Sequence, residues 1–175
     1  MMAVRAKTIR NRSLAFRLFI GIVVLMFCQW FGAYIGIPVS FRIDLFLYLI
    51  VGVAPLLKPL HHFFLAIALG YLLDGLSGRL WGFHIATYVC AVAFIHLTAE
   101  EMEMRSLPYQ IILTAICATI QELFILVYTL NSYDSFPNTL DFVLSILLPR
   151  LAVTIVAAIF FLALISSWMM GERER

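Results

Sequence analysis

The feature that most constrains this chain is a series of long windows without a charged residue, at 18–41, 80–99, 106–121 and 151–171. Each window is about long enough for a helix to cross a ~30 Å hydrocarbon layer. The sequence is 63% hydrophobic and 13% charged, whereas soluble domains have about 45–50% apolar and about 25% charged residues. These properties exclude a soluble globular protein and predict an all-α integral membrane protein.

Charges and helix breakers divide the chain into a bundle of about six transmembrane helices. A turn at Lys58-Pro59 separates the second helix from the third, because proline removes a backbone donor. Pro149 is expected to kink the last helix or to separate a short outer segment from it. The expected helices cover 18–41, 44–57, 60–76, 82–98, 108–130 and a final stretch from after Thr139 to near Met170.

Lysine and arginine gather on one side of the expected spans. The basic tail at 1–17, the Lys58 turn, the Arg105 loop and the tail at 171–175 share that side. Such an excess marks the cytoplasmic face, so both termini are expected in the cytoplasm. The helical bundle at 18–170 leaves no room for a soluble domain, and 1–175 is expected to form a single transmembrane domain. The net charge of +2 is too small to predict a nucleic-acid partner.

Three charged residues fall inside the expected spans: Asp74, Glu122 and Arg150. Charges in a bilayer are costly and usually face a packed interior, a partner or water. Counting ~1.5 Å per residue along each helix places all three at a similar depth in the outer half of the bundle. We expect Arg150 to pair with Asp74, with Glu122 or with both, as one intramembrane polar cluster. The alternative is that each side chain reaches the headgroups separately.

A stripe of small residues runs along the third expected helix. Ala66, Gly70, Asp74 and Gly78 recur at every fourth position and therefore share one face. Small residues allow close helix packing in membranes. The neighbour of this stripe is either another helix of the same chain or a different protein.

The four histidines do not form a metal site by spacing. His61 and His62 are adjacent, His84 lies toward the opposite membrane face, and His96 is near only Glu100 in sequence. No three ligands converge, so the histidines are interpreted as interfacial residues and no metal or other cofactor is expected. We also find no phosphate-binding loop, nucleophile elbow or zinc-protease motif. Enzymatic activity is therefore not expected.

The stretch 70–82 resembles a motif of the bacterial rod shape-determining MreD family. Gly70, Asp74, Ser77, Gly78 and Gly82 match the family pattern G-x-x-x-D-hydrophobic-x-S-G-x-x-x-G at the end of the third helix. The length and the number of expected spans agree over essentially the whole chain. Further similarities are the Arg-x-Asp before the second helix, the acidic Glu122 in the fifth and Pro149 in the last span.

This resemblance implies a non-enzymatic component of the machinery that synthesises the lateral cell wall of rod-shaped bacteria. The implied location is the bacterial inner membrane. The implied direct partner is the bitopic protein MreC, and MreB, RodZ, RodA and the transpeptidase partner of RodA are implied members of a larger complex. The family supplies no catalytic residues.

A substrate-binding membrane subunit of an energy-coupling-factor-type vitamin transporter is the alternative. Such subunits are also six-helix proteins of about this size, and the MreD fold looks related to theirs. A polar pocket formed by the outer loops, together with Ala/Gly surfaces for a coupling subunit, would distinguish the transporter. The chain has Ala66 and Gly70 but few polar residues in its loops, which favours the cell-wall function.

Overall fold

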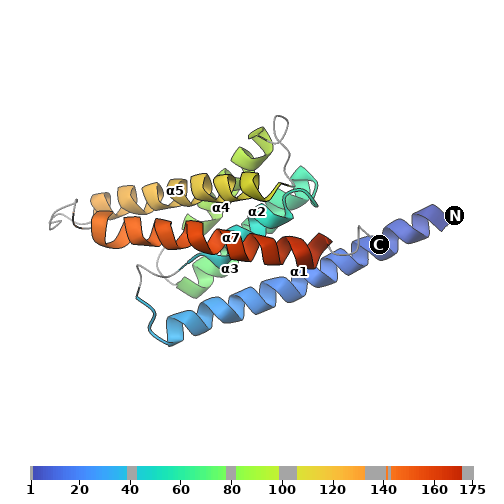
Figure 1. The fold of residues 1–175 in the computed structure, drawn as a ribbon, viewed down its shortest axis with the longest axis horizontal. Coiled ribbons are helices and arrows are strands. Elements are labelled where there is room, and N and C mark those ends of the chain that lie inside the picture. The colour runs from blue at the N-terminus through green and yellow to red at the C-terminus, as the bar shows by residue number, and fades with distance from the viewer. Residues whose placement is uncertain are drawn as a thin grey trace.

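The computed structural model describes residues 2–38, 43–77, 82–98, 106–132, 141 and 143–170. Within these ranges the protein is helical and contains no strand, which confirms the expected all-α class (Figure 1). Gly78, the Glu100, Glu101 and Glu103 run, Arg105 and the tail at 171–175 lie outside the described residues. The elements are α1 (Met2–Tyr34), α2 (Leu45–Val53), α3 (Pro59–Ser77), α4 (Phe83–Thr98), α5 (Leu107–Ser132), the π-helix η2 (Val143–Leu147) and α7 (Leu148–Met170).

Four segments of the described chain are long and apolar enough to cross a membrane: Ala15–Gly32, Pro59–Leu76, Leu107–Val127 and Val143–Ile165. They coincide with the first, third, fifth and last expected spans. Helix α4 is also apolar but has 16 residues. The protein is therefore a multi-pass membrane protein by the length and composition of its helices.

Helix α2 lies at the centre of the bundle, and all nine of its residues are buried. It contacts α1, α3, α4, α5 and α7, so it needs no polar face. Its length of about 14 Å is less than half of a bilayer core. The expected helix 44–57 is too long, because Pro55 has no N–H to donate to Val51 O. The N–H of Ala54 bonds to that carbonyl instead, at 3.3 Å, and the helix ends there.

Two antiparallel helix pairs surround α2. Helices α5 and α7 run side by side, while α3 and α4 form the most extensive pairing in the protein (Figure 1). Gly70 makes the second pairing possible, because a Cβ atom at this position would lie 2.6 Å from both Cα and N of Ile85. Only a residue without a side chain fits between two backbones at this distance.

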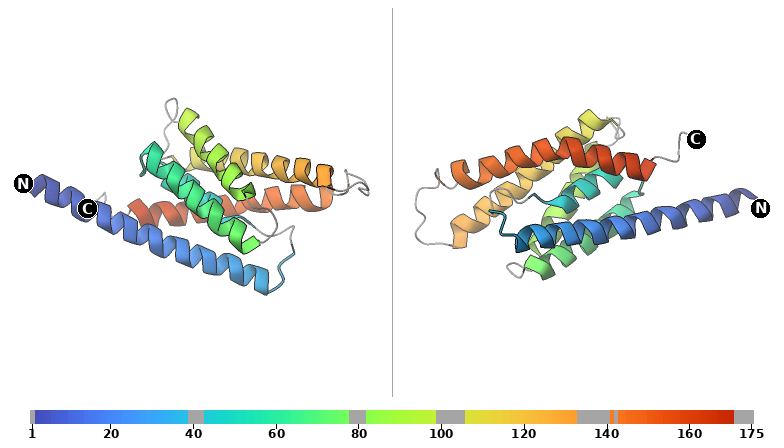
Figure 2. Two further views of the ribbon diagram at one scale, coloured as in Figure 1. Left: turned by 180° about the vertical axis from the view of Figure 1, so that it is seen from behind. Right: turned by 60° about the horizontal axis from the view of Figure 1, so that its bottom comes forward.

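Helix α1 lies along one side of the bundle, and its N-terminal part projects beyond the other helices (Figure 2). The segment expected as a basic tail, 1–17, is helical from Met2 and continues into the span. The helix ends at Tyr34, before the expected limit at 41, because Gly36 adopts a positive φ of 79°. The N–H of Ile37 then donates to Gly32 O, which is a Schellman cap.

A hydrogen bond joins the first helix to the C-terminal part of the last one. The guanidinium Nη1 of Arg17 donates to the backbone carbonyl of Trp168 at 3.2 Å. The last carbonyls of a helix lack partners within the helix and attract cations. Arg17 therefore stabilises the end of α7 and holds α1 against it.

The last span begins with a π-helix, η2, which is followed directly by α7. Pro149 is the second residue of α7, and its missing N–H interrupts the helical hydrogen-bond ladder where η2 passes into α7. The expected short outer segment is therefore η2. Wider π-helical turns are often found next to functional residues, and Arg150 follows Pro149 directly.

We predict that Gly70→Ala lowers the free energy of unfolding by about 2 kcal/mol or more, because the added methyl group overlaps the α4 backbone. Gly75→Ala is the matched control on the same helix, since a Cβ atom there has no neighbour within 4 Å. Thermal unfolding in detergent measures both variants. Equal stability of the two variants would contradict the close α3–α4 contact.

Candidate functional site

The polar side chains buried in the bundle begin with Asp44, which precedes the apolar run of α2. Asp44 is the N-cap of this helix, with φ −88° and ψ 96°, and its Oδ1 accepts from the N–H of Phe46 at 3.1 Å. The first backbone N–H groups of a helix have no partner within it. An aspartate supplies one, which is why aspartate is favoured at this position.

Two more side chains donate to the same carboxylate. The hydroxyl of Tyr88, on α4, lies 2.7 and 2.6 Å from the two carboxylate oxygens. The amide Nε2 of Gln121, on α5, donates to Oδ2 at 3.1 Å. All three residues are buried. The carboxylate of Asp44 therefore joins α2, α4 and α5 through uncharged donors.

Glu122 and Arg150 form an ion pair beside this carboxylate. The Nε of Arg150 lies 3.1 Å from Oε1 of Glu122, and their side chains are 17% and 11% exposed. The pair joins α5 to α7. The second carboxylate oxygen of Glu122, Oε2, is buried and has no hydrogen-bond partner among the described residues.

The central helix is also bonded to α7. The hydroxyl of Tyr48, on α2, donates to the backbone carbonyl of Thr154 at 2.8 Å. The hydroxyl of Thr154 donates in turn to the carbonyl of Arg150 at 2.8 Å. The backbone that carries Arg150 is thus held by a buried tyrosine from α2.

Asp74 belongs to the connection between α3 and α4. Its Oδ2 accepts from the N–H of Gly82 at 2.8 Å, and its Oδ1 accepts from the N–H of His84 at 3.0 Å. The Nδ1 of His84 lies 2.7 Å from Oδ1. Gly82 has a φ of 92°, which residues with a side chain rarely adopt. Asp74 thus stabilises the first turn of α4, where a negative charge is favoured.

The structure therefore divides the three charged residues that the sequence suggested as one cluster. Arg150 forms an ion pair with Glu122, which is one of the pairings expected from the sequence. Asp74 bonds instead to the start of α4. Its depth along α3 was a poor guide, because the depth of a residue does not specify which side of its helix it lies on.

The stripe of small residues on α3 packs against α4 of the same chain. Ala66 is fully buried, Gly70 lies against the backbone of Ile85, and Asp74 bonds to α4. Gly78 lies outside the described residues. Of the motif at 70–82, Ser77 is the last residue of α3 and Gly82 precedes α4. The described part of the motif builds the α3–α4 connection.

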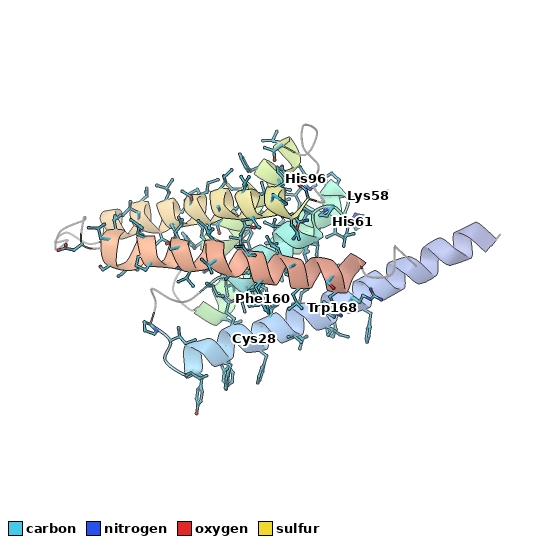
Figure 3. The ribbon with its side chains drawn as sticks, viewed as in Figure 1. Cys28, Lys58, His61, His96, Phe160 and Trp168 are labelled. Atoms are coloured by element: carbon cyan, nitrogen blue, oxygen red, sulfur yellow. The ribbon has the colours of Figure 1, made fainter. Side chains whose placement is uncertain are left out.

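The interpretation of all four histidines as interfacial residues is wrong for His62 and His96, which contact each other between α3 and α4. His62 is fully buried and lies 3.1 Å from His96, measured from Nδ1 to Nε2. Figure 3 shows His96, Lys58 and His61 at one end of the bundle. His84 bonds to Asp74 at the start of α4. No group of three or more potential metal ligands occurs among the described residues.

The sequence analysis noted Asp44 only within the Arg-x-Asp before the second helix, and it missed Tyr88 and Gln121 as site residues. A signal for Asp44 exists, since an acidic residue directly before an apolar run is a helix N-cap pattern. Gln121 is adjacent to Glu122, so it lies at nearly the same depth. Nothing in the sequence around Tyr88 indicates that its hydroxyl is directed toward a carboxylate.

The buried polar groups thus join four helices, α2, α4, α5 and α7, through hydrogen bonds and one ion pair. Hydrogen-bonded side-chain networks in a low-dielectric interior favour one helix arrangement. In comparisons with family models, curated proteins and solved structures, nothing matched this chain.

We predict that Arg150→Gln lowers the free energy of unfolding by about 3–5 kcal/mol, because it leaves the buried Glu122 carboxylate without its cation. Adding Glu122→Gln should restore part of the loss, which a double-mutant cycle in thermal unfolding measures. Asp74→Asn combined with Arg150→Gln is the control cycle. We expect no coupling energy in the control cycle. A coupling energy larger than that of the Glu122 cycle would show that Arg150 pairs with Asp74 and not with Glu122.

Proposed function

We propose that this chain is a non-enzymatic component of the machinery that builds the lateral cell wall of rod-shaped bacteria, of the MreD type. The observation that carries the proposal is the pairing of buried polar side chains with one another, as in Asp44 with Tyr88 and Glu122 with Arg150. Such pairs fix helices relative to one another. A fixed helix arrangement suits a protein whose task is to hold partners together.

The resemblance to the MreD family supports the proposal through the stretch 70–82. Gly70 permits the close α3–α4 contact, Asp74 bonds to the start of α4, and Gly82 adopts the positive φ of the connection. Chains that build the same connection need these residue types at these positions. We infer that the stretch is a common element of one membrane fold.

The proposed topology has six crossings with both termini in the cytoplasm of a bacterial inner membrane. Four crossings are the long apolar helices, and α4 is the fifth. The sixth is α2 with the chain on either side of it. Non-helical backbone is tolerated at membrane depth where protein surrounds it, and α2 is surrounded by five helices.

The proposed direct partner is the bitopic protein MreC. MreB, RodZ, RodA and the transpeptidase that works with RodA are the proposed members of the larger complex. Lipid covers the remaining apolar surface, which includes Phe19, Phe64 and Phe160.

The substrate-binding subunit of an energy-coupling-factor-type transporter stays the second candidate. The observation that favours it is Oε2 of Glu122, a buried oxygen without a hydrogen-bond donor among the described residues. Buried polar atoms of this kind are uncommon, and a ligand that donates a hydrogen bond would satisfy one.

We predict that affinity purification of the tagged chain from native membranes in mild detergent recovers a bitopic coiled-coil protein together with wall-synthesis enzymes. Mass spectrometry identifies the stoichiometric partners. Gly75→Ala should keep the same partners, whereas Gly70→Leu should lose them at equal membrane abundance, because it separates α3 from α4. Recovery of a coupling membrane subunit with paired ATPases would instead identify a transporter.

The six-span topology predicts that residues 35 and 58 lie on opposite sides of the membrane. Cys28, Cys90 and Cys117 are first replaced by alanine. Ile35→Cys should then react with a membrane-impermeant maleimide that is added to intact cells. Lys58→Cys should react only after the cells are opened. Labelling of both positions from outside would mean that α2 does not complete a crossing.

A further inference from the structure

The C-terminal end of α2 is bonded to a buried histidine. The Nε2 of His62, on α3, lies 3.0 Å from the backbone carbonyl of Ile50. In a longer helix this carbonyl would accept from the N–H of Ala54, but that group bonds to Val51 O. Because a carbonyl can only accept, Nε2 of His62 must carry a hydrogen.

The second ring nitrogen of His62 determines which ring nitrogen of His96 carries the hydrogen. When His62 is neutral, its Nδ1 has a lone pair and accepts from Nε2 of His96, on α4, at 3.1 Å. The two rings meet edge to face with their centroids 5.2 Å apart. The neutral pair therefore satisfies three polar groups from three helices: the Ile50 carbonyl and the two facing ring nitrogens.

No described carboxylate contacts this pair. The four described carboxylates lie elsewhere: Asp44 at the start of α2, Asp74 against the start of α4, Glu122 on α5 beside Arg150, and Asp141 before η2. Neither histidine forms an ion pair among the described residues.

The other titratable groups on the neighbouring elements offer no compensating charge. On α2, the Tyr48 hydroxyl is bonded to α7. On α5, the hydroxyl of Tyr109 is bonded to Thr98, on α4. Lys58, before α3, is a cation, and His61 is exposed. The remaining titratable groups of α4, namely His84, Tyr88 and Cys90, are bonded to carboxylates or exposed.

We propose that His62 and His96 form an acid-sensitive latch that holds α3, α4 and the end of α2 together, at the end of the bundle where Lys58 lies. The latch is closed while the pair is neutral and opens when both imidazoles are protonated. This inference does not depend on the proposed function.

The two protons have different effects. The first adds to Nδ1 of His96, which leaves the hydrogen bond between the rings intact. The second must add to Nδ1 of His62, which then faces the N–H of His96. The bond is lost, and two adjacent cations repel each other at the buried ring of His62. Because the folded chain disfavours these charges, stability is present above about pH 6.5 and is lost as the pH falls below it.

The test is thermal unfolding of the full chain in detergent between pH 7.5 and pH 5.5. We expect the apparent Tm of the wild type to fall by about 5–10 °C over this range. The Tm of His96→Gln should fall by about half as much, because the glutamine amide can donate to His62 but takes up no proton. His61→Gln is the matched control, and its Tm should fall by as much as that of the wild type. Equal falls for the wild type and His96→Gln would overturn the latch.

A second measurement keeps the proposal testable if a variant fails to fold. Nitrogen NMR of the wild type labelled with 15N-histidine reports which ring nitrogens carry hydrogen. We expect a neutral ring with hydrogen on Nε2 for both His62 and His96 at pH 7.5. A doubly protonated His62 at that pH would overturn the proposal.

Discussion

Helix α2 begins and ends inside an apolar bundle, and this constraint determines the positions of most buried polar groups. In lipid, no water satisfies the unpaired N–H groups at the start of a helix or the unpaired carbonyls at its end. Asp44 accepts at the start, and His62 donates at the end. Each of these side chains is in turn hydrogen-bonded to another helix. The hydrogen bonds that satisfy the two ends of α2 therefore also couple it to α3, α4 and α5.

The ion pair between Glu122 and Arg150 adds α7 to this arrangement. A buried pair contributes little net stability, because removing two charges from water costs about as much as their attraction returns. Its effect lies in specificity: α5 and α7 can slide or rotate only by separating charges. Tyr48 limits the same motion from the other side, since its hydroxyl is bonded to the backbone of α7. The bundle is therefore held by a few directional contacts within a large apolar surface.

Much of the helical framework could be predicted from the sequence, because prolines and charges mark its boundaries. The predicted helix 60–76 is found as Pro59–Ser77, and 82–98 is found as Phe83–Thr98. The length of α2 was overestimated because the effect of Pro55 was overlooked. The partner of Asp74 depends on the positive φ of Gly82, and the partner of His62 depends on which carbonyl α2 leaves unpaired. Both follow from tertiary geometry that no local pattern contains.

The groups that satisfy α2 also come later in the chain than α2 itself. Asp44 needs Tyr88 and Gln121, and the Ile50 carbonyl needs His62. During synthesis, α2 therefore emerges from the ribosome well before its partners have been made. The insertion apparatus must shelter this segment until α5 has entered the membrane. The bundle thus matures as one unit around its second helix, and a truncated chain that stops before α5 would leave the Asp44 carboxylate without its Gln121 donor.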